Sequence, residues 1–429
     1  MTLKIDTSGS EWDTKLSYSF NDNVSAQDYQ SDIIFPIVTS LDGEGENSQR
    51  RHLGAFQSDL TYNLPLEIKM ETGIKTSYQD YNSTADYYKS ENDNLVSDSL
   101  RTNAFKYQEN INAFYFQASR KLFFDFQLKA GVRMEQTYMK GHQTIPLDTS
   151  FIVNRADWFP YLYLSRKLIH IMGIELYGYA IYRKTINRPE YQQLNPYIRY
   201  VDQFLYETGN PALKPQFTEN IEFNVSFDDM PIFAIGQNRT TDIFSNVVYK
   251  DKLQESIAVR TYDNLGNSKE TYLRGIAGIP PGGKYFFAIG AQYNLNAYDG
   301  FYEGQPLTYE RGSWRFFTFH ALKIFPDTRL TVNGFLMQNG QFNFYEMKNF
   351  GQLNIGITQT LFDKKLTITL NARDILKTMQ TEFSLNQGSI NTYGSRYSDN
   401  QRFGIRIKYN FGISKKEEKK GVLKEDMNE

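Results

Sequence analysis

The chain has 429 residues, of which 15% are aromatic and 22% are charged, and it contains 31 Tyr, 32 Phe and no Cys. This composition is too aromatic for a disordered protein, and a mean hydropathy of -0.55 is too low for a bundle of membrane-spanning helices. The net charge of -2 gives no reason to expect a nucleic-acid partner, and the lack of Cys excludes disulfides, thiolate metal sites and cysteine nucleophiles.

Hydropathy along the chain separates two kinds of membrane protein. No stretch approaches the roughly 18 apolar residues of a transmembrane helix. Strands of a barrel are not excluded, because only every second side chain of such a strand faces lipid. The first twenty residues lack a basic segment followed by an apolar one, so we expect any signal peptide to lie upstream of Met1.

The clearest elements, in chain order, are strands with a strict period of two. In residues 66–75, Leu66, Ile68, Met70 and Ile74 lie on one face, and Glu67, Lys69, Glu71 and Lys75 lie on the other. The same alternation recurs in residues 126–135, 365–373 and 402–411. A helix would scatter the charges around its axis, whereas a pleated strand sorts them onto two faces. We expect the charged faces to line a wet interior, because they are costly against lipid.

Three less regular segments complete the prediction. Residues 109–120 and 171–183 are interpreted as strands because helix caps are absent, and residues 253–279 as one long bulged strand. The chain then holds about sixteen antiparallel strands.

The predicted connections alternate between short turns and long loops. Short ones fall near 64–65, 120–121, 170, 229–231, 280–284, 326–327 and 363–364, and long ones near 22–50, 80–100, 139–155, 185–217, 300–310 and 377–400. All long loops of an antiparallel meander would then lie at one end, as in bacterial outer-membrane barrels. Aromatic clusters at 158–161 and 316–319, placed near strand ends, fit interfacial girdles. The alternative is a soluble sandwich, which also has one apolar face per strand.

One predicted loop, residues 187–218, is rich in turn-forming residues. We expect these to hold its shape: Pro189, Pro196, Gly209, Asn210, Pro211 and Pro215. A tyrosine ring offers a flat apolar face and a polar tip, which suits sugars, peptides or aromatic chelates. Candidate ligand contacts in this and other outer loops are Tyr197, Arg199, Tyr200, Tyr206, Tyr87, Tyr88 and Tyr393. The alternative is that these tyrosines pack the loops against each other.

Catalytic and metal-binding patterns are not found. The four His residues lack metal-ligand spacing, and no nucleophile elbow occurs. The acidic pieces 42–47 and 91–94 could offer oxygen ligands to calcium but lack the EF-hand pattern, so we interpret them as solvated loops. We expect no enzymatic activity, metal or cofactor.

An ordered series of motifs adds a family resemblance. It comprises ENINAFY (109–115), GVRME (131–135), WFP (158–160), NRP (187–189), LNPY (194–197), GNPALKP (209–215), DIL (374–376) and YNFG (409–412). The series resembles the barrel of TonB-dependent outer-membrane receptors, and most resembles the outer-membrane β-barrel family of Bacteroidetes-type bacteria.

The resemblance implies a receptor in the outer membrane of a Gram-negative cell, with about 22 strands around an amino-terminal plug. This sequence has neither the plug nor the TonB box of that pattern, and about six strands too few. We therefore expect residues 1–412 to be the carboxy-terminal part of a barrel and residues 413–429 to be a charged, disordered tail. Implied partners are outer-membrane lipid, the barrel assembly machinery, a surface lipoprotein, and TonB where a plug is supplied upstream. The open alternatives are a secreted or surface β-sandwich that binds glycans and a plugless diffusion pore.

Overall fold

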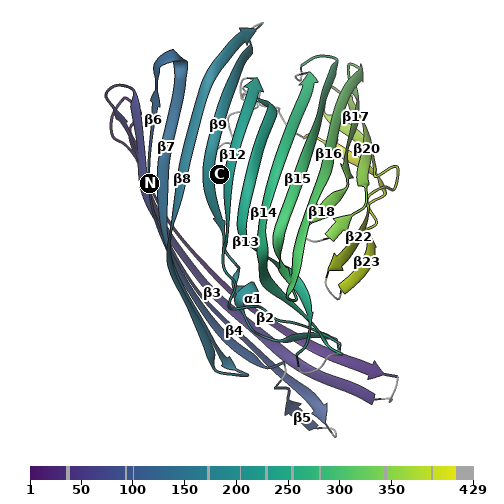
Figure 1. The fold of residues 1–429 in the computed structure, drawn as a ribbon. Helices are drawn as coiled ribbons and strands as arrows, with labels where there is room; N and C mark the ends of the chain where they lie inside the picture. Colours follow the sequence, from purple (N-terminus) through teal and green to yellow (C-terminus); the bar gives the residue numbers. More distant parts are fainter. Residues whose placement is uncertain are drawn as a thin grey trace. The chain divides into compact units, whose positions relative to one another are not determined.

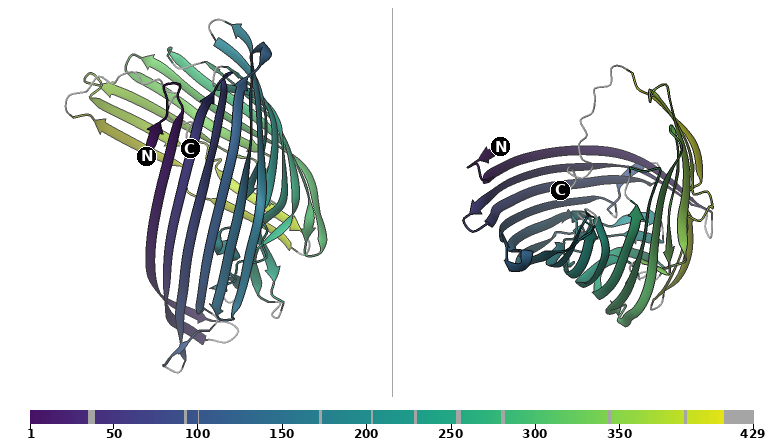
Figure 2. Two further views of the ribbon diagram at one scale, coloured as in Figure 1. Left: turned by 90° about the vertical axis from the view of Figure 1, so that its left-hand side faces the viewer. Right: turned by 90° about the horizontal axis from the view of Figure 1, so that it is seen from above.

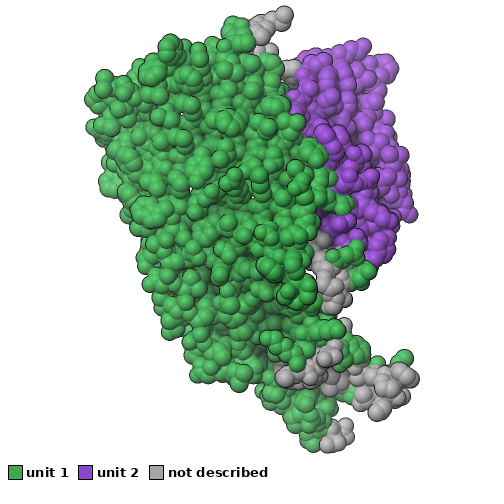
Figure 3. Space-filling view, viewed as in Figure 1, with its two compact units in different colours: residues 1–274, 293–312, 386–391 green, residues 275–292, 313–385, 392–429 purple. Residues whose placement is uncertain are grey.

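The computed structural model describes residues 1–34, 39–91, 94–99, 101–171, 174–202, 204–227, 230–252, 256–279, 282–342, 345–387 and 390–411. The chain divides into two compact units, coloured in Figure 3. Unit 1 holds residues 1–274, 293–312 and 386–391, and unit 2 holds residues 275–292, 313–385 and 392–429. The predicted tail, 413–429, lies outside the described residues.

Nearly all described elements are strands (Figure 1). The long strands are β2 (Glu11–Ile33), β3 (Thr39–Leu64), β4 (Ile68–Glu91), β6 (Asn103–Lys121), β7 (Phe126–Ile145), β8 (Thr149–Ile171), β9 (Ile174–Asn187), β12 (Gln216–Phe227), β13 (Met230–Lys250), β14 (Ala258–Ile279), β15 (Tyr285–Tyr302), β16 (Gln305–Phe325), β17 (Thr328–Gln338), β20 (Phe350–Leu361), β21 (Leu366–Arg373) and β24 (Arg402–Tyr409). The short elements are β1 (Thr2–Lys4), β5 (Asn94–Ser97), η1 (Phe123–Asp125), α1 (Tyr191–Leu194), β10 (Arg199–Asp202), β11 (Leu205–Glu207), β18 (Gly340–Phe342), β19 (Tyr345–Met347), β22 (Gln380–Gln387) and β23 (Ile390–Tyr397). In the described part of the chain, no helix has the length and apolar character needed to span a membrane.

Strands that follow each other in unit 1 pair antiparallel. The ladder runs β2–β3–β4–β6–β7–β8–β9–β12–β13. The β2–β3 pairing is continuous from Glu11↔Thr61 to Ile33↔Thr39, and the left view in Figure 2 shows these first strands side by side. In unit 2 the ladder β16–β17–β20–β21–β24 is likewise antiparallel.

Of the described strands in the 20-stranded sheet, sixteen have eight or more residues, which matches the prediction of about sixteen. Two further strands of eight residues, β22 and β23, belong to a separate four-stranded sheet. The segment interpreted as one bulged strand is a single strand, β14. The uncertain segment 109–120 lies within β6, and the described part of 171–183 lies in β8 and β9.

Several predicted loops are wrong, because the strands are longer than the sequence pattern indicated. Residues assigned to loops at 22–50, 80–100, 139–155 and 300–310 belong mostly to strands. The acidic piece 42–47 lies within β3, Glu91 ends β4, and residues 92–93 are outside the described part. The loop predicted at 377–400 contains β22 and β23. A barrel strand needs only about 9–11 residues to cross a membrane, so strands of 20 or more residues, such as β7 with 20, must continue beyond it.

Two smaller corrections concern strand ends. Leu66 and Glu67 have φ of 66° and 57° and form a turn, so β4 begins at Ile68. Such left-handed backbone is incompatible with a strand. The aromatic clusters at 158–161 and 316–319 lie inside β8 and β16 rather than near their ends.

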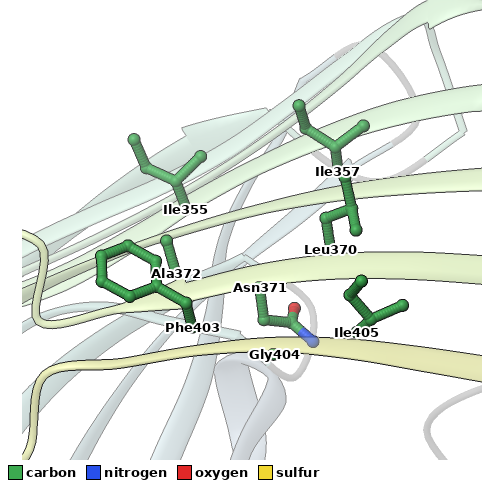
Figure 4. Close-up of a pocket in the computed structure, with 8 residues that line it drawn as sticks. All are labelled: Ile355, Ile357, Leu370, Asn371, Ala372, Phe403, Gly404 and Ile405. Atoms are coloured by element: carbon green, nitrogen blue, oxygen red, sulfur yellow. The ribbon is translucent and has the colours of Figure 1, made fainter.

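Each ladder has two chemically distinct faces near the short turns. One face, here called the aliphatic face, carries side chains such as Ile74, Phe114 and Val132 in unit 1 and Ile357, Leu370 and Ile405 in unit 2, all at least 39% exposed. The opposite face, here called the polar face, carries the charged side chains of the same strands. A shallow concavity of about 480 Å³ lies on the aliphatic face of β20, β21 and β24. Figure 4 shows the residues that line it.

Candidate functional site

The segment between β9 and β12, residues 188–215, is here called the inner loop. It carries α1, β10 and β11, and α1 lies toward the same end of the strands as β5 (Figure 1). The loop folds onto the polar face of the ladder and buries the cluster Tyr81, Phe105, Tyr107, Met139, Leu194 and Leu213. Partly buried Phe151, Val153, Tyr191, Phe244 and Tyr262 pack against this cluster. The inner loop is therefore part of an apolar core at the long-loop end of unit 1.

A buried ion pair fixes the start of the inner loop. The Arg188 Nη2 atom lies 2.5 Å from Glu135 Oε2 and 3.0 Å from Thr137 Oγ1. Glu135 also pairs with Arg133 at 2.6 Å, and its side chain is only 7% exposed. Removing one member of a buried pair leaves an uncompensated charge, which is strongly destabilising. This contact explains why the NRP motif has an arginine at its centre.

A tight turn fixes the middle of the inner loop. The backbone N–H groups of Gly209 and Asn210 donate to the carbonyls of Asn195 and Gln193 at 2.8 and 2.7 Å. A Cβ atom on Gly209 would lie 2.4 Å from the Asn195 carbonyl oxygen, so only glycine fits this close approach. The Asn210 side chain donates to the Tyr262 carbonyl at 2.9 Å and accepts from the Ala212 N–H at 2.9 Å.

Asn264 holds the end of the inner loop. Its amide accepts from the Lys214 N–H at 2.8 Å and donates to the Lys214 carbonyl at 3.0 Å. Pro189 and Pro215 are buried nearby. With Leu194 and Leu213 they line a cavity of about 20 Å³, which is room for about one water. Side chains therefore fill the space beneath the inner loop, and the cavity is too small for a ligand larger than about one water.

Most of the tyrosines predicted to contact a ligand form hydrogen bonds with other residues of the chain instead. The Tyr197 hydroxyl donates to the Arg101 carbonyl at 2.8 Å, and burial raises the pKa of Tyr197 to about 12. The Tyr206 hydroxyl donates to Asp251 at 2.6 Å. Tyr87 is 7% exposed and bonds to Asn47 and Gln27.

The remaining predicted contacts differ in exposure and position. Arg199 is exposed and pairs with Glu207, which also pairs with Arg260 at 2.6 Å. Tyr88 is 44% exposed. Tyr200 belongs to β10, but its side chain lies outside the described part of the structure. Tyr393 belongs to unit 2 and to strand β23 rather than to a loop. It is 63% exposed and donates to Glu382 at 2.7 Å.

The sequence analysis missed a second group of tyrosines in unit 1. Tyr298 stacks on Tyr309 at 5.4 Å between ring centroids, and Tyr249 stacks on Tyr302 at 5.3 Å. Three of them lie near the stretch 300–310 that was assigned to a loop. Their signal is that Tyr298 and Tyr302 are four residues apart along β15, which places both side chains on the same face of the strand.

The polar face near the short turns carries a charged network. Glu71 accepts from Gln117 at 2.7 Å and pairs with Lys129 at 3.0 Å. The Tyr115 hydroxyl donates to Asp59 at 2.9 Å. Of the charged residues predicted to share one face, Lys69, Glu71 and Lys129 pair there, whereas Glu67 lies in the turn. Further along β7, Arg133 pairs with Glu135, which also holds Arg188 of the inner loop. Among the described residues, no three His, Asp or Glu side chains are grouped so that they could hold a metal ion.

Comparison with known proteins identifies the family. The model of the outer membrane protein beta-barrel family matches residues 3–409. No curated protein matches the sequence. Among solved structures, the chain is similar to the copper transporter OprC, with a TM-score of 0.62, 11% identity, and coverage of 94% of this chain and 63% of that one.

Two further solved structures are similar over the same extent. The ferripyoverdine receptor of the outer membrane of Pseudomonas aeruginosa has a TM-score of 0.58 and 11% identity, and the match covers 94% of this chain and 54% of that chain. The ferric yersiniabactin uptake receptor FyuA from Yersinia pestis has a TM-score of 0.57 and 11% identity, with coverage of 94% and 61%. The chain thus spans between about half and two thirds of these proteins. At this identity the likeness shows the fold.

Because the family model matches nearly the whole chain, the two faces of the sheet can be assigned, and the β-sandwich alternative is wrong. In an outer-membrane barrel the aliphatic face contacts lipid and the polar face points inward. Trp158 is 61% exposed on β8, whereas its neighbour Phe159 is 7% exposed. An exposed indole ring on the outer face of a strand is of the kind that barrels place at the membrane interface. The chain belongs to the outer membrane protein beta-barrel family, and its strands form an antiparallel β-barrel of the outer membrane.

Proposed function

We propose that this barrel is the wall of a receptor that imports a scarce nutrient, with energy relayed by TonB through a plug domain inside the barrel. The observation that carries the proposal is the fold shared over 94% of the chain with a copper transporter and with two receptors of ferric chelates. In this proposal the chain has no catalytic role.

The charged network of the polar face supports the same function. Glu71, Lys129 and Arg133 face inward near the short turns, where side chains of this kind can hydrate or bind a polar plug surface. Lipid is the partner of the aliphatic face, and the barrel assembly machinery would insert the strands. A surface lipoprotein is a further proposed partner at the long-loop end.

Energy-coupled uptake can be tested in cells that carry the gene together with its upstream coding sequence. Uptake of the nutrient should stop when TonB is deleted, while the barrel remains in the outer-membrane fraction and shifts on a gel after boiling. Uptake that continues without TonB, together with ion conductance of the purified chain in a planar bilayer, would support a diffusion pore instead.

Ligand capture is proposed for the outer side chains Tyr87, Tyr88, Tyr197, Arg199, Tyr200, Tyr206 and Tyr393. The exposure of Tyr88, Arg199 and Tyr393 favours these three. Replacing Tyr200 and Tyr206 with Ala should weaken capture and leave assembly intact, as judged by uptake and by the gel shift. Since the Tyr206 hydroxyl bonds to Asp251, Tyr206→Phe is the matched variant that removes this bond and keeps the ring. Failure of the Ala variant to assemble would assign these tyrosines to the scaffold.

A further inference from the structure

Two arginines of unit 1 lie at the short-turn end of the aliphatic face. Arg120 of β6 is aligned with Leu128 of β7, and Phe126 of β7 is aligned with Arg166 of β8. Residues aligned across antiparallel strands lie on one face of the sheet. Along β7 this is the face of Val132, so both arginines belong to the surface that contacts lipid.

The charge pairing of these arginines differs from that of the lysines that follow them in the sequence. Lys121 and Lys167 lie on the opposite, polar face, since neighbours in a strand point to opposite sides. Each lysine pairs with a carboxylate, Lys121 with Asp125 at 3.0 Å and Lys167 with Glu175. The two arginines are exposed, and in the described part of the chain neither forms an ion pair; Asp125 attracts Arg166 only from a longer distance. The short-turn end of the aliphatic face therefore carries two unpaired cations.

The turn between β6 and β7 adds an apolar surface beside them. Phe123 and Phe124 are 78% and 73% exposed, and their ring centroids are 5.7 Å apart. Phe124 and Asp125 have φ of 57°, a left-handed backbone that glycine, asparagine or aspartate adopts more readily than phenylalanine. A turn in water usually carries such small or polar residues. Two exposed Phe residues instead indicate that this turn lies at the membrane interface, where aromatic rings are enriched.

Apolar side chains also lie beside Arg166. Its guanidinium carbon is 5.1 Å from the centroid of the Phe126 ring, an attractive contact between a cation and an aromatic face. Leu168 and Ile169, further along β8, are 49% and 52% exposed. A cation bordered by exposed apolar side chains matches the boundary of a bilayer, where the acyl chains end and the headgroup begins.

The charges define the chemistry of the lipid. A guanidinium group binds two oxygens of a phosphate through parallel hydrogen bonds. An anionic phospholipid is attracted by both cations, whereas the positive group of a zwitterionic phospholipid cancels most of this attraction. Short turns of outer-membrane barrels lie on the periplasmic side, so the lipid belongs to the leaflet that faces the periplasm.

We propose that Arg120, Arg166, Phe123 and Phe124 form a binding site for the phosphate headgroup of an anionic phospholipid in the periplasmic leaflet of the outer membrane. This inference rests on membership of the barrel family, which places the aliphatic face in lipid. It is independent of nutrient uptake, so its failure would leave the proposed receptor function standing.

The test is native mass spectrometry of the purified full chain in a non-ionic detergent, titrated with phosphatidylglycerol or with phosphatidylcholine of the same acyl chains. Phosphatidylglycerol should bind more tightly than phosphatidylcholine. Arg120→Gln combined with Arg166→Gln should weaken phosphatidylglycerol binding about thirtyfold, because each cation near an anionic headgroup contributes roughly fivefold. Phe123→Ser combined with Phe124→Ser should weaken the binding of both lipids, because the rings contact the interfacial part that the two lipids share.

The matched control is Lys121→Gln combined with Lys167→Gln, which removes the same charge from neighbouring positions on the polar face. It should bind phosphatidylglycerol like the wild type, and an equal loss in the two double variants would show that net charge alone attracts the lipid. Equal affinity of the wild type for both lipids would overturn the proposal as well. Binding of inorganic phosphate, tested without lipid and with the same dependence on the arginines, would assign them to a free anion instead. The gel shift on boiling confirms that each variant is folded.

Discussion

In the long strands of unit 1, side chains alternate between the outer and the inner face along the whole strand. Near the short turns the apolar side chains point outward, whereas toward the long-loop end they point inward. Near the short turns, β4 points Ile74 outward and Glu71 inward. Toward the long-loop end, the same strand points Asp80 outward and buries Tyr81 inward at 4% exposure. On β7, outward Val132 gives way to Lys140, and inward Lys129 gives way to Met139. The outward side chains of each half match the medium around an outer-membrane barrel: apolar side chains where the strand faces lipid, and polar side chains where it faces water.

This difference teaches that the inner loop replaces the lipid as the apolar partner of the strands. Outside the membrane, an apolar outer face would meet water, so the apolar side chains move inward and need cover there. Leu194, Leu213 and Tyr191 provide that cover. The half with the inner loop should therefore respond to core mutations as a soluble protein does, and the membrane half should not.

The largest expected effect is at the ion pair that starts the inner loop. Glu135→Ala leaves the largely buried guanidinium group of Arg188 without its carboxylate partner, which should lower the free energy of unfolding by about 3 kcal/mol or more. Denaturant unfolding in detergent measures the change. Lys129→Ala is the control in the membrane half, and its loss should be smaller because this side chain is 33% exposed. Equal losses would show that the two halves do not differ in this way.

The next effect is at the apolar core under the inner loop. Leu194, at 1% exposure, fills a close-packed site, so Leu194→Ala should lower the free energy of unfolding by about 2–4 kcal/mol. Limited proteolysis should then cut within residues 188–215. Ile357→Ala, on the aliphatic face at 42% exposure, is the matched control, because lipid can fill the space left there. If proteolysis is unchanged in Leu194→Ala, the loop is held by its hydrogen bonds alone.

A smaller effect is expected at the turn of the inner loop. Gly209→Ala places a methyl group against backbone atoms that cannot move independently, and should lower the free energy of unfolding by about 1–3 kcal/mol. Thermal unfolding measures the shift. Gly404→Ala, where a Cβ atom meets nothing within 4 Å, should unfold like the wild type. A similar shift in both variants would contradict the close approach at Gly209.

The smallest effect is a pH dependence confined to the long-loop end. Burial raises the pKa of Tyr197 to about 12, while the unfolded chain has a tyrosine pKa of about 10. The associated stability is fully present below pH of about 10 and is lost as the pH rises through about 12, because the unfolded state releases the proton first. Proteolysis of the inner loop between these pH values should increase in the wild type and less so in Tyr197→Phe. An identical pH profile in the two proteins would refute the assignment to Tyr197.

Much of the fold could be predicted from the sequence. A period of two in segments such as 126–135 and 402–411 requires a strand with one apolar and one polar face, whatever surrounds it. The position of the short turns, the number of long strands and the location of the inner loop follow from the same pattern. Gly209 and the prolines also marked that loop correctly, because backbone conformation is a local property.

The tertiary structure alone decided how far the strands extend and where the inner loop goes. In residues 80–91 and 139–145 the alternation continues but its phase reverses, so the stretches looked like polar loops. The reversal makes sense only once the loop 188–215 is known to cover the inner face, and no local rule contains that contact. Arg188 meets Glu135 across 53 residues of chain. Local sequence determined which backbone each segment adopts, whereas packing between distant segments decided which side chains are buried.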